Sequence, residues 1–287
     1  MRTCFLLALL ITAISACQSE AGDMRSSIRR LEKQTADSIR PVLTERYLAY
    51  ADTYPQDSVR VPQYLQRAAR MKRARFEYSA AIELLYRAIR EYYHRPETVE
   101  NVLLLHDIFQ EDVQTPFLIT TIEQAGREAF PSLADRWSAT NTAIEGLLKQ
   151  RQQEVYESAA LQIDYSAANE LVTASELYAL LLPYSELSPE LLLSAAEITR
   201  GLGVYRRSLE LLDWVATRYP NHPKAAQALF LRAFTLDEQL RDTTAAREAY
   251  QLFLRKHPEH EFAGDAKVLL DQLSEIGGQK SVVGDQE

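Results

Sequence analysis

The chain has 287 residues, of which 46% are hydrophobic and 25% are charged, and its formal net charge is −8. A sequence of this length and composition can form a substantial apolar core, which excludes a wholly disordered chain. The acidic excess argues against general nucleic-acid binding, because that function needs a basic surface. The low counts of glycine (9) and proline (11) suit long helices.

Residues 1–16 have the pattern of a secretory signal peptide. Arg2 is followed by an apolar run from Phe5 to Ile14 and then by small residues. This run is too short to cross a bilayer, which takes about 20 apolar residues. The tetrad from Ile14 to Cys17 resembles the bacterial lipoprotein processing box. The resemblance implies cleavage before Cys17 and acylation of its sulfur; the alternative is an ordinary leader with an incidental cysteine.

Residues 17–25 are polar and are predicted to be a lipidated tether. In the lipoproteins that the box resembles, an Asp after the cysteine would imply retention in the inner membrane. Gln18 stands there instead, so the expected location is the cell envelope, with an outer-membrane anchor facing the periplasm. Cys4 lies in the leader, so the mature chain has no second cysteine for a disulfide.

Prolines divide the remaining chain into helical segments at a regular period. Helical patterns over 26–39 and 41–54 come first. Two triplets of prolines follow: Pro62, Pro96 and Pro131, then Pro189, Pro223 and Pro258. Within each triplet the prolines are 34 and then 35 residues apart. Each proline of the second triplet lies 127 residues after its counterpart in the first. We therefore predict two copies of one helical unit, over residues 26–137 and 138–276, followed by a flexible tail over 277–287.

The clearest hairpin pattern runs from residue 188 to residue 220. Ser188 is a candidate cap for its first helix, and Gly201 and Gly203 interrupt the periodicity where a turn is expected. No strand precedes these glycines and no Lys-Ser or Lys-Thr pair follows them, so a phosphate-binding loop is not favoured. Small residues that would let two helices approach closely recur on both sides of the turn: Ala195, Ala196 and Ser208.

This hairpin resembles the tetratricopeptide repeat (TPR), which has a small pair in its first helix, Gly then Tyr at the turn, and Pro at the end. The resemblance implies an all-α solenoid of TPR-type helical hairpins, with a concave face that holds protein partners. The segment TRYPNHPKAAQALFLRAF resembles the envelope TPR lipoproteins of diderm bacteria. These include the lipoprotein of the outer-membrane β-barrel assembly machine and the TPR protein that works with the cell-division envelope complex.

The stretch RAARMKRAR, residues 67–75, carries five basic residues within an acidic chain. It could bind a peptide carboxylate, an acidic peptide segment or an anionic envelope polymer, or it could be a basic helix face offset by neighbouring acids. The TPR resemblance implies partner-binding positions on the first helix of each hairpin. These positions are Gln63, Gln66, Arg70 and Arg73 in the first copy, and Glu190, Leu193, Glu197 and Arg200 in the second.

The sequence contains no recognisable catalytic or metal-binding motif beside the repeats. The five histidines form no HExxH motif, and neither a nucleophile motif nor a phosphate loop is found. We therefore predict no catalytic residue, no metal and no cofactor. The leading hypothesis is a non-catalytic, lipid-anchored envelope scaffold that binds a protein or peptide and no nucleic acid. The alternatives are a binder of anionic glycan or peptidoglycan fragments and a divergent enzyme.

Overall fold

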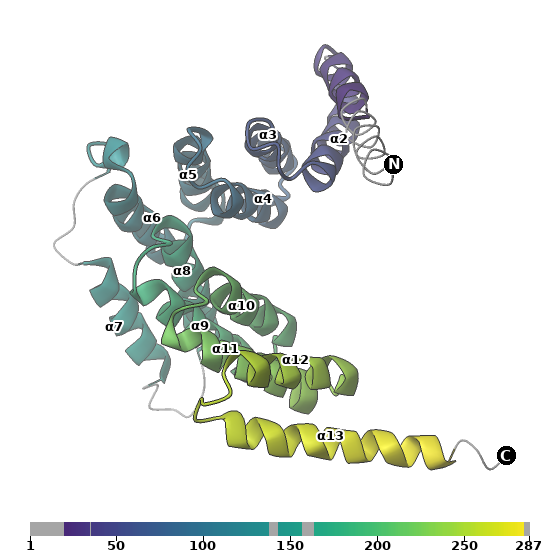
Figure 1. Cartoon of the computed structure of the whole chain (residues 1–287). Coiled ribbons are helices and arrows are strands. Elements are labelled where there is room, and N and C mark those ends of the chain that lie inside the picture. The colour runs from purple at the N-terminus through teal and green to yellow at the C-terminus, as the bar shows by residue number, and fades with distance from the viewer. Residues whose placement is uncertain (1–19, 35, 138–142, 157–163, 284–287) are drawn as a thin grey trace, which may run out of the picture. The chain divides into compact units, whose positions relative to one another are not determined.

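The computed structural model describes residues 20–34, 36–137, 143–156 and 164–283, and this part of the chain is all-α (Figure 1). The chain forms two compact units, unit 1 (Met1–Ile119) and unit 2 (Thr120–Glu287). The sequence places the boundary later, between 137 and 138. Within each unit, successive helices pack in neighbouring pairs, which confirms the predicted fold class of TPR-type helical hairpins.

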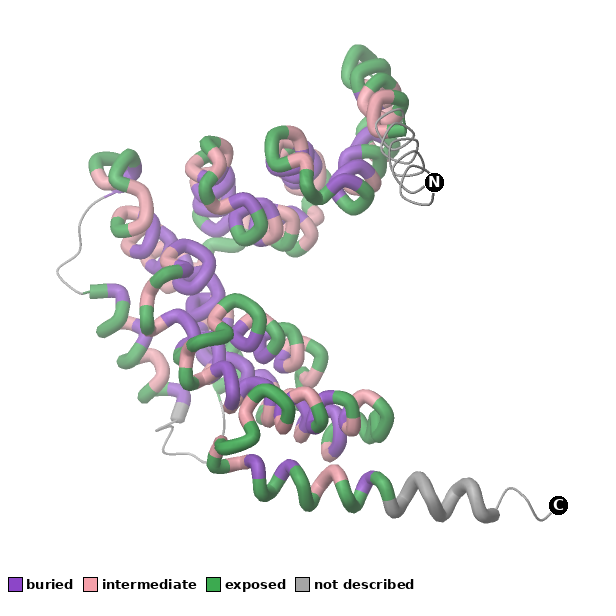
Figure 2. The backbone as a smooth tube through the Cα atoms, in the orientation of Figure 1, coloured by how far each residue is buried: buried purple, intermediate pink, exposed green. Residues whose placement is uncertain are grey.

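The described part of unit 1 begins with a helix over residues 20–32 and continues through four labelled helices and a π-helical turn. These are α2 (Ile39–Thr53), α3 (Val61–Arg73), α4 (Tyr78–Glu91), α5 (Glu97–Asp107) and η1 (Ile108–Val113). Helix α3 packs on both α2 and α4, so the buried residues, purple in Figure 2, lie along the helix faces that meet.

The helix over residues 20–32 overlaps the segment that the sequence assigns to the tether. Ala21, Met24, Ile28 and Leu31 recur at helical spacing and pack against the core around Tyr47. The prediction of a tether over 17–25 missed this apolar stripe because it begins among polar residues. The helical core of unit 1 therefore extends back to residue 20.

Unit 2 contains the helices that the structure describes after η1. After α6 (Pro116–Ala129), which spans the division between the units, come η2 (Pro131–Leu133), α7 (Ile144–Tyr156), α8 (Tyr165–Leu181), α9 (Leu187–Gly201) and α10 (Tyr205–Arg218). The unit ends with α11 (Pro223–Phe234), the π-helical turn η3 (Thr235–Gln239), α12 (Thr243–Lys256) and α13 (Ala263–Val283). Each of the helices from α7 to α13 packs on the next.

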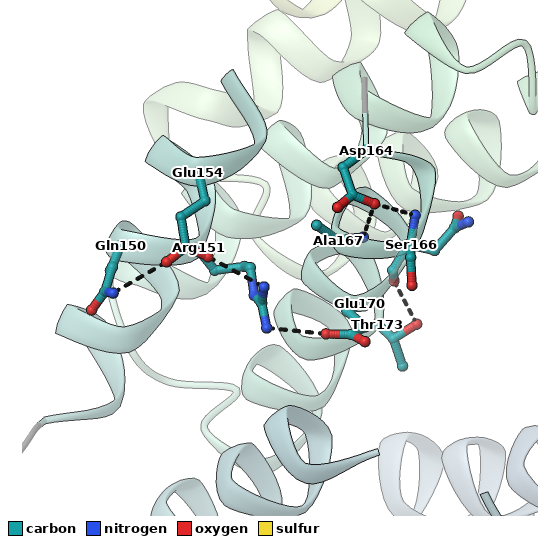
Figure 3. Close-up of polar contacts among 9 residues, drawn as sticks. Gln150, Arg151, Glu154, Asp164, Ser166, Ala167, Glu170 and Thr173 are labelled. Atoms are coloured by element: carbon teal, nitrogen blue, oxygen red, sulfur yellow. Dashed lines mark hydrogen bonds and ion pairs between the residues drawn. The ribbon is translucent and has the colours of Figure 1, made fainter. Parts of the chain in front are cut away.

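Polar contacts fix the start of α8 and its packing on α7 (Figure 3). The carboxylate of Asp164 caps α8 by accepting hydrogen bonds from the backbone N–H groups of Ser166 (2.9 Å) and Ala167 (3.1 Å). Arg151 of α7 reaches across to Glu170 of α8 at 3.2 Å. These contacts hold α7 against the hairpins that follow it.

The last helix is longer than the sequence predicts. The expected tail begins at 277, but α13 continues to Val283. Glycines 277 and 278 each weaken a helix by about 1 kcal/mol relative to alanine, which is why the sequence pattern indicates an end there. A helix that is already formed can still extend through such positions, because each added residue gains a hydrogen bond.

The two copies predicted from the sequence, residues 26–137 and 138–276, share backbone details at the offset of 127. Helix α10 begins and ends 127 residues after α4, and α12 begins and ends 127 residues after α6. Both π-helical turns also begin at equivalent positions, Ile108 and Thr235. Residues with positive φ recur at the same offset: Phe76 (61°) with Gly203 (78°), and Gln114 (59°) with Arg241 (55°). The repeat found in the sequence is therefore a repeat of the backbone.

Small buried residues allow the helices of a hairpin to approach closely. Ala195 and Ala196 of α9 are almost fully buried, as are Ala68 and Ala69 of α3. The hydroxyl of Ser208 on α10 donates to the carbonyl of Ala196 at 2.8 Å, a contact that a larger side chain would prevent.

Candidate functional site

The predicted partner-binding residues of α3 lie beside α5, and two of them form a polar ladder with it. The side-chain amide of Gln63 donates to Glu97 at 2.8 Å. The amide of Gln66 donates to Asn101 at 2.9 Å. The first helices of two successive hairpins are thus joined through residues that the sequence assigns to a partner.

Arg73, at the end of α3, is held between two carboxylates of η1. Its Nη2 lies 2.6 Å from Glu111 and its Nε lies 2.6 Å from Asp112. Burial opposes the charge of Arg73, but the hydrogen bonds to Asp112 and Glu111 outweigh this and raise the pKa of the guanidinium. The π-helical turn η1 places both acids beside Arg73, so its charge is balanced within unit 1.

Most of the basic stretch 67–75 is neutralised in the same way. Lys72 and Arg75 both pair with Glu77, at 2.6 and 2.9 Å, and Lys72 lowers the pKa of that carboxyl. Arg67 pairs with Glu32 of the first helix. For four of the five basic residues, the structure therefore supports a basic helix face whose charge is balanced by neighbouring acids.

Arg70 is the exception. It is exposed, and among the described residues no acidic side chain pairs with it. It lines an open hollow of 330 Å³ that we call the Arg70 pocket, formed by Arg70, Arg73, Ala74, Phe76, Tyr78, Leu104 and Asp112. Leu104, one of its walls, is the α5 residue that lies 34 positions after Arg70. The pocket thus combines an available guanidinium with apolar and aromatic surface.

Phe76 is the most exposed of the large apolar residues described, with 78% of its surface accessible. It sits in the turn between α3 and α4, and its ring lies edge-on to Tyr78 with 6.2 Å between the ring centroids. Sequence reasoning did not select Phe76 as a site residue. The signal was present, because the offset of 127 aligns this phenylalanine with Gly203.

The corresponding positions in unit 2 do not form an equivalent basic surface. Glu190 is exposed, but Leu193 is only 3% exposed, so its side chain belongs to the core and is not available to a partner. Glu197 replaces Arg70, and it is half-buried. The guanidinium of Arg200 lies 5.9 Å from the ring centroid of Phe234, where it makes a cation–π contact.

A second hollow, of 560 Å³, lies in unit 2 between the loop that precedes α9 and the loop that precedes α11. It is lined by prolines and tyrosines together with Ser185, Glu186, Arg218, Asn221 and His222. It contains none of the predicted partner-binding residues.

Histidines near the helix starts have structural roles. Nδ1 of His222 accepts a hydrogen bond from the backbone N–H of Lys224, and Nδ1 of His260 accepts one from Phe262, each at 3.2 Å. No group of three potential metal ligands occurs within the described ranges. None of the helices in the described part of the chain is both long and apolar enough to cross a bilayer. Cys17 lies outside the described residues.

No protein-family model matches the sequence, and no curated protein does. Among solved structures, a similar chain is described as the TPR2AB-domain:pHSP90-complex of yeast Sti1. It is 14% identical, the match covers 90% of this chain and 99% of that chain, and the TM-score is 0.35. At this TM-score the match carries no weight, so the fold class rests on the helix pairs and on the duplicated backbone.

Proposed function

We propose that this chain is a non-catalytic scaffold that binds an acidic segment of another protein, and that Arg70 contacts the carboxylate of that segment. The observation that carries the proposal is the contrast among the five basic residues of the stretch 67–75. Four are paired with acids of unit 1, and Arg70 is exposed beside a hollow. A guanidinium has a planar fork of donors that matches a carboxylate.

The ladder between α3 and α5 supports the same function by fixing the wall beside Arg70. Gln63 and Gln66 tie the two helices together, and Arg73 ties α3 to η1. Because these side chains are already hydrogen-bonded within the unit, they need not be ordered when a partner binds. A surface that is rigid beforehand loses less entropy on binding.

Replacing Arg70 tests the proposal. Reversal of its charge in Arg70→Glu should reduce capture of the partner by about tenfold, the effect of losing an energetically important contact of about 1.4 kcal/mol. The measurement is crosslinking of the full chain in cells, followed by quantitative mass spectrometry. Arg206→Glu is the matched control, because Arg206 is exposed on α10 of unit 2 and the change in charge is the same.

Two outcomes would count against the proposal. One is the absence of any reproducible protein partner, and the other is equal capture by Arg70→Glu and by the control. If purified peptidoglycan fragments bind the full chain and Arg70→Glu alone abolishes this binding while no protein is captured, the ligand is an anionic polymer instead.

We further propose that the scaffold works in the cell envelope, tethered by a lipid on Cys17. The support is the sequence from Ile14 to Cys17, with the signal-peptide pattern before it. Cys17→Ser should release the protein from the membrane fraction and abolish incorporation of labelled palmitate, because the acylated sulfur is lost. Cys4→Ser is the matched control, since Cys4 lies within the leader. A Cys17→Ser protein that is still processed and still membrane-bound would contradict the lipid anchor.

A further inference from the structure

Two turns with the same backbone carry very different residues. In the α3–α4 turn, the N–H of Phe76 donates to the carbonyl of Arg73 at 2.9 Å, and the N–H of Glu77 donates to Lys72 at 3.0 Å. In the α9–α10 turn, Gly203 donates to Arg200 at 3.0 Å, and Val204 donates to Thr199 at 2.8 Å. The turn in unit 2 shows that glycine is sufficient for this geometry.

Phenylalanine is unfavourable at this position for two physical reasons. Its φ of 61° lies in the left-handed region, where a side chain with a Cβ is strained and glycine is not. Its ring also gains little from burial, because 78% of its surface is exposed. The fold of unit 1 therefore does not explain why a large aromatic side chain stands here. Residues held in strained conformations cluster at functional sites.

We propose that Phe76 is an aromatic anchor of the binding site and that it selects an apolar side chain next to the carboxylate held by Arg70. The inference rests on the proposed function and specifies the partner: a peptide segment in which an acidic residue and a large apolar residue are neighbours. Phe76 and Arg70 line the same hollow, so one short segment can contact both. Ala74 and Tyr78 supply further apolar surface in it.

The charges around the turn favour a peptide over an anionic membrane as the occupant. Glu77, Glu111 and Asp112 surround the end of α3 and neutralise Lys72, Arg73 and Arg75. Because these charges are balanced, an anionic bilayer would be attracted by Arg70 alone, whereas attraction to anionic lipids takes a cluster of several unpaired basic residues. A peptide can place its single carboxylate at Arg70 and keep its apolar side chain against Phe76.

The test is an array of short peptides in which two adjacent positions are varied through all pairs of amino acids, probed with the full chain. We expect the strongest binding where one position is Asp or Glu and the other is aromatic or a large aliphatic residue. Phe76→Gly should lower binding of these peptides about tenfold while leaving acidic peptides without an apolar neighbour unchanged. Arg70→Glu should lower binding of all acidic peptides.

Phe76→Gly should leave the fold of the turn unchanged, because unit 2 already has glycine at the equivalent position. We expect hydrogen exchange in α3 and α4 to be as slow as in the original chain or slower, so a loss of binding cannot be attributed to unfolding. Phe76→Tyr is the conservative variant and should keep most of the binding. Gly203→Phe should not create the same preference, because Glu197 stands where unit 1 has Arg70.

The outcomes distinguish the role of Phe76 from that of Arg70. Equal preferences for Phe76→Gly and the original chain would overturn the role of Phe76 and leave the role of Arg70 intact. A failure of all acidic peptides to bind would overturn the proposed function and this inference together. Binding to phosphatidylglycerol vesicles that requires Phe76, without any peptide preference, would also overturn the inference and assign the residue to a membrane contact.

Discussion

Arg207→Ala is expected to destabilise unit 2 by roughly 3 kcal/mol, because it removes the guanidinium that balances a buried carboxylate. The side chain of Glu176 on α8 is only 4% exposed and pairs with Arg207 of α10. Burial disfavours the charge of Arg207, but Glu176 and Glu210 outweigh it and raise the pKa of the guanidinium. This expected loss of stability lies at the low end of the range for a broken buried ion pair, because the side chain of Arg207 is 40% exposed.

Unit 1 supplies the control for this prediction. Between α2 and α8 the offset is 128, as shown by Tyr50 and Tyr178, which are both almost fully buried. At the positions equivalent to Glu176 and Arg207, unit 1 therefore has Leu48 and Ala80, and Leu48 packs against the core. The double variant Glu176→Leu with Arg207→Ala copies this pair into unit 2. It should recover stability to within about 1 kcal/mol of the original, because the buried charge is gone as well. If the double variant is less stable than Arg207→Ala alone, the pair stabilises unit 2 in a way that the leucine does not replace.

Phe253→Ala should destabilise unit 2 by about 3–5 kcal/mol, the usual loss when a fully buried phenylalanine is truncated. Phe253 of α12 is 0% exposed and lies at the centre of an aromatic cluster. Its ring centroid lies 5.7 Å from that of Phe230, 5.7 Å from that of His260 and 6.0 Å from that of His257. The truncation would leave a cavity among rings that cannot close around a methyl group.

Hydrogen exchange read by mass spectrometry is the appropriate measurement for both variants, because a chain of two units need not unfold in one step. Protection should fall in peptides from unit 2 and stay unchanged in α2 to α4 of unit 1. Val268→Ala is the control for Phe253→Ala, since Val268 is 57% exposed on α13 and its truncation should change stability by no more than about 0.5 kcal/mol. A loss of protection spread equally over both units would show that they unfold together.

Much of the fold could be predicted from prolines, small residues and the offset of 127. The prolines mark helix boundaries because a proline interrupts helical hydrogen bonding, and the small residues mark close helix contacts. The residues at which helices start are harder to predict from the sequence. Ser188 was expected to cap α9, but it lies inside the helix and is fully buried, with its hydroxyl donating to the carbonyl of Leu182 at 2.7 Å. Ser185 lies two residues before the helix, and its hydroxyl accepts a hydrogen bond from the N–H of Leu187 at 3.2 Å.

The site could be located only in part from the sequence. The TPR resemblance placed Gln63, Gln66, Arg70 and Arg73 on one helix, but it could not show which of them already have partners. The pairing of Arg73 depends on η1, whose π-helical turn brings Glu111 and Asp112 to the end of α3. A sequence pattern does not reveal such a turn. The exposure of Phe76 likewise depends on the backbone of its turn.

The pattern of helix contacts has a mechanical consequence. Within the described residues of each unit, helices contact their neighbours in the chain and, at most, the next hairpin. A terminal hairpin can therefore detach under tension without breaking the contacts of the rest. Such a unit should lengthen in steps under load instead of giving way all at once.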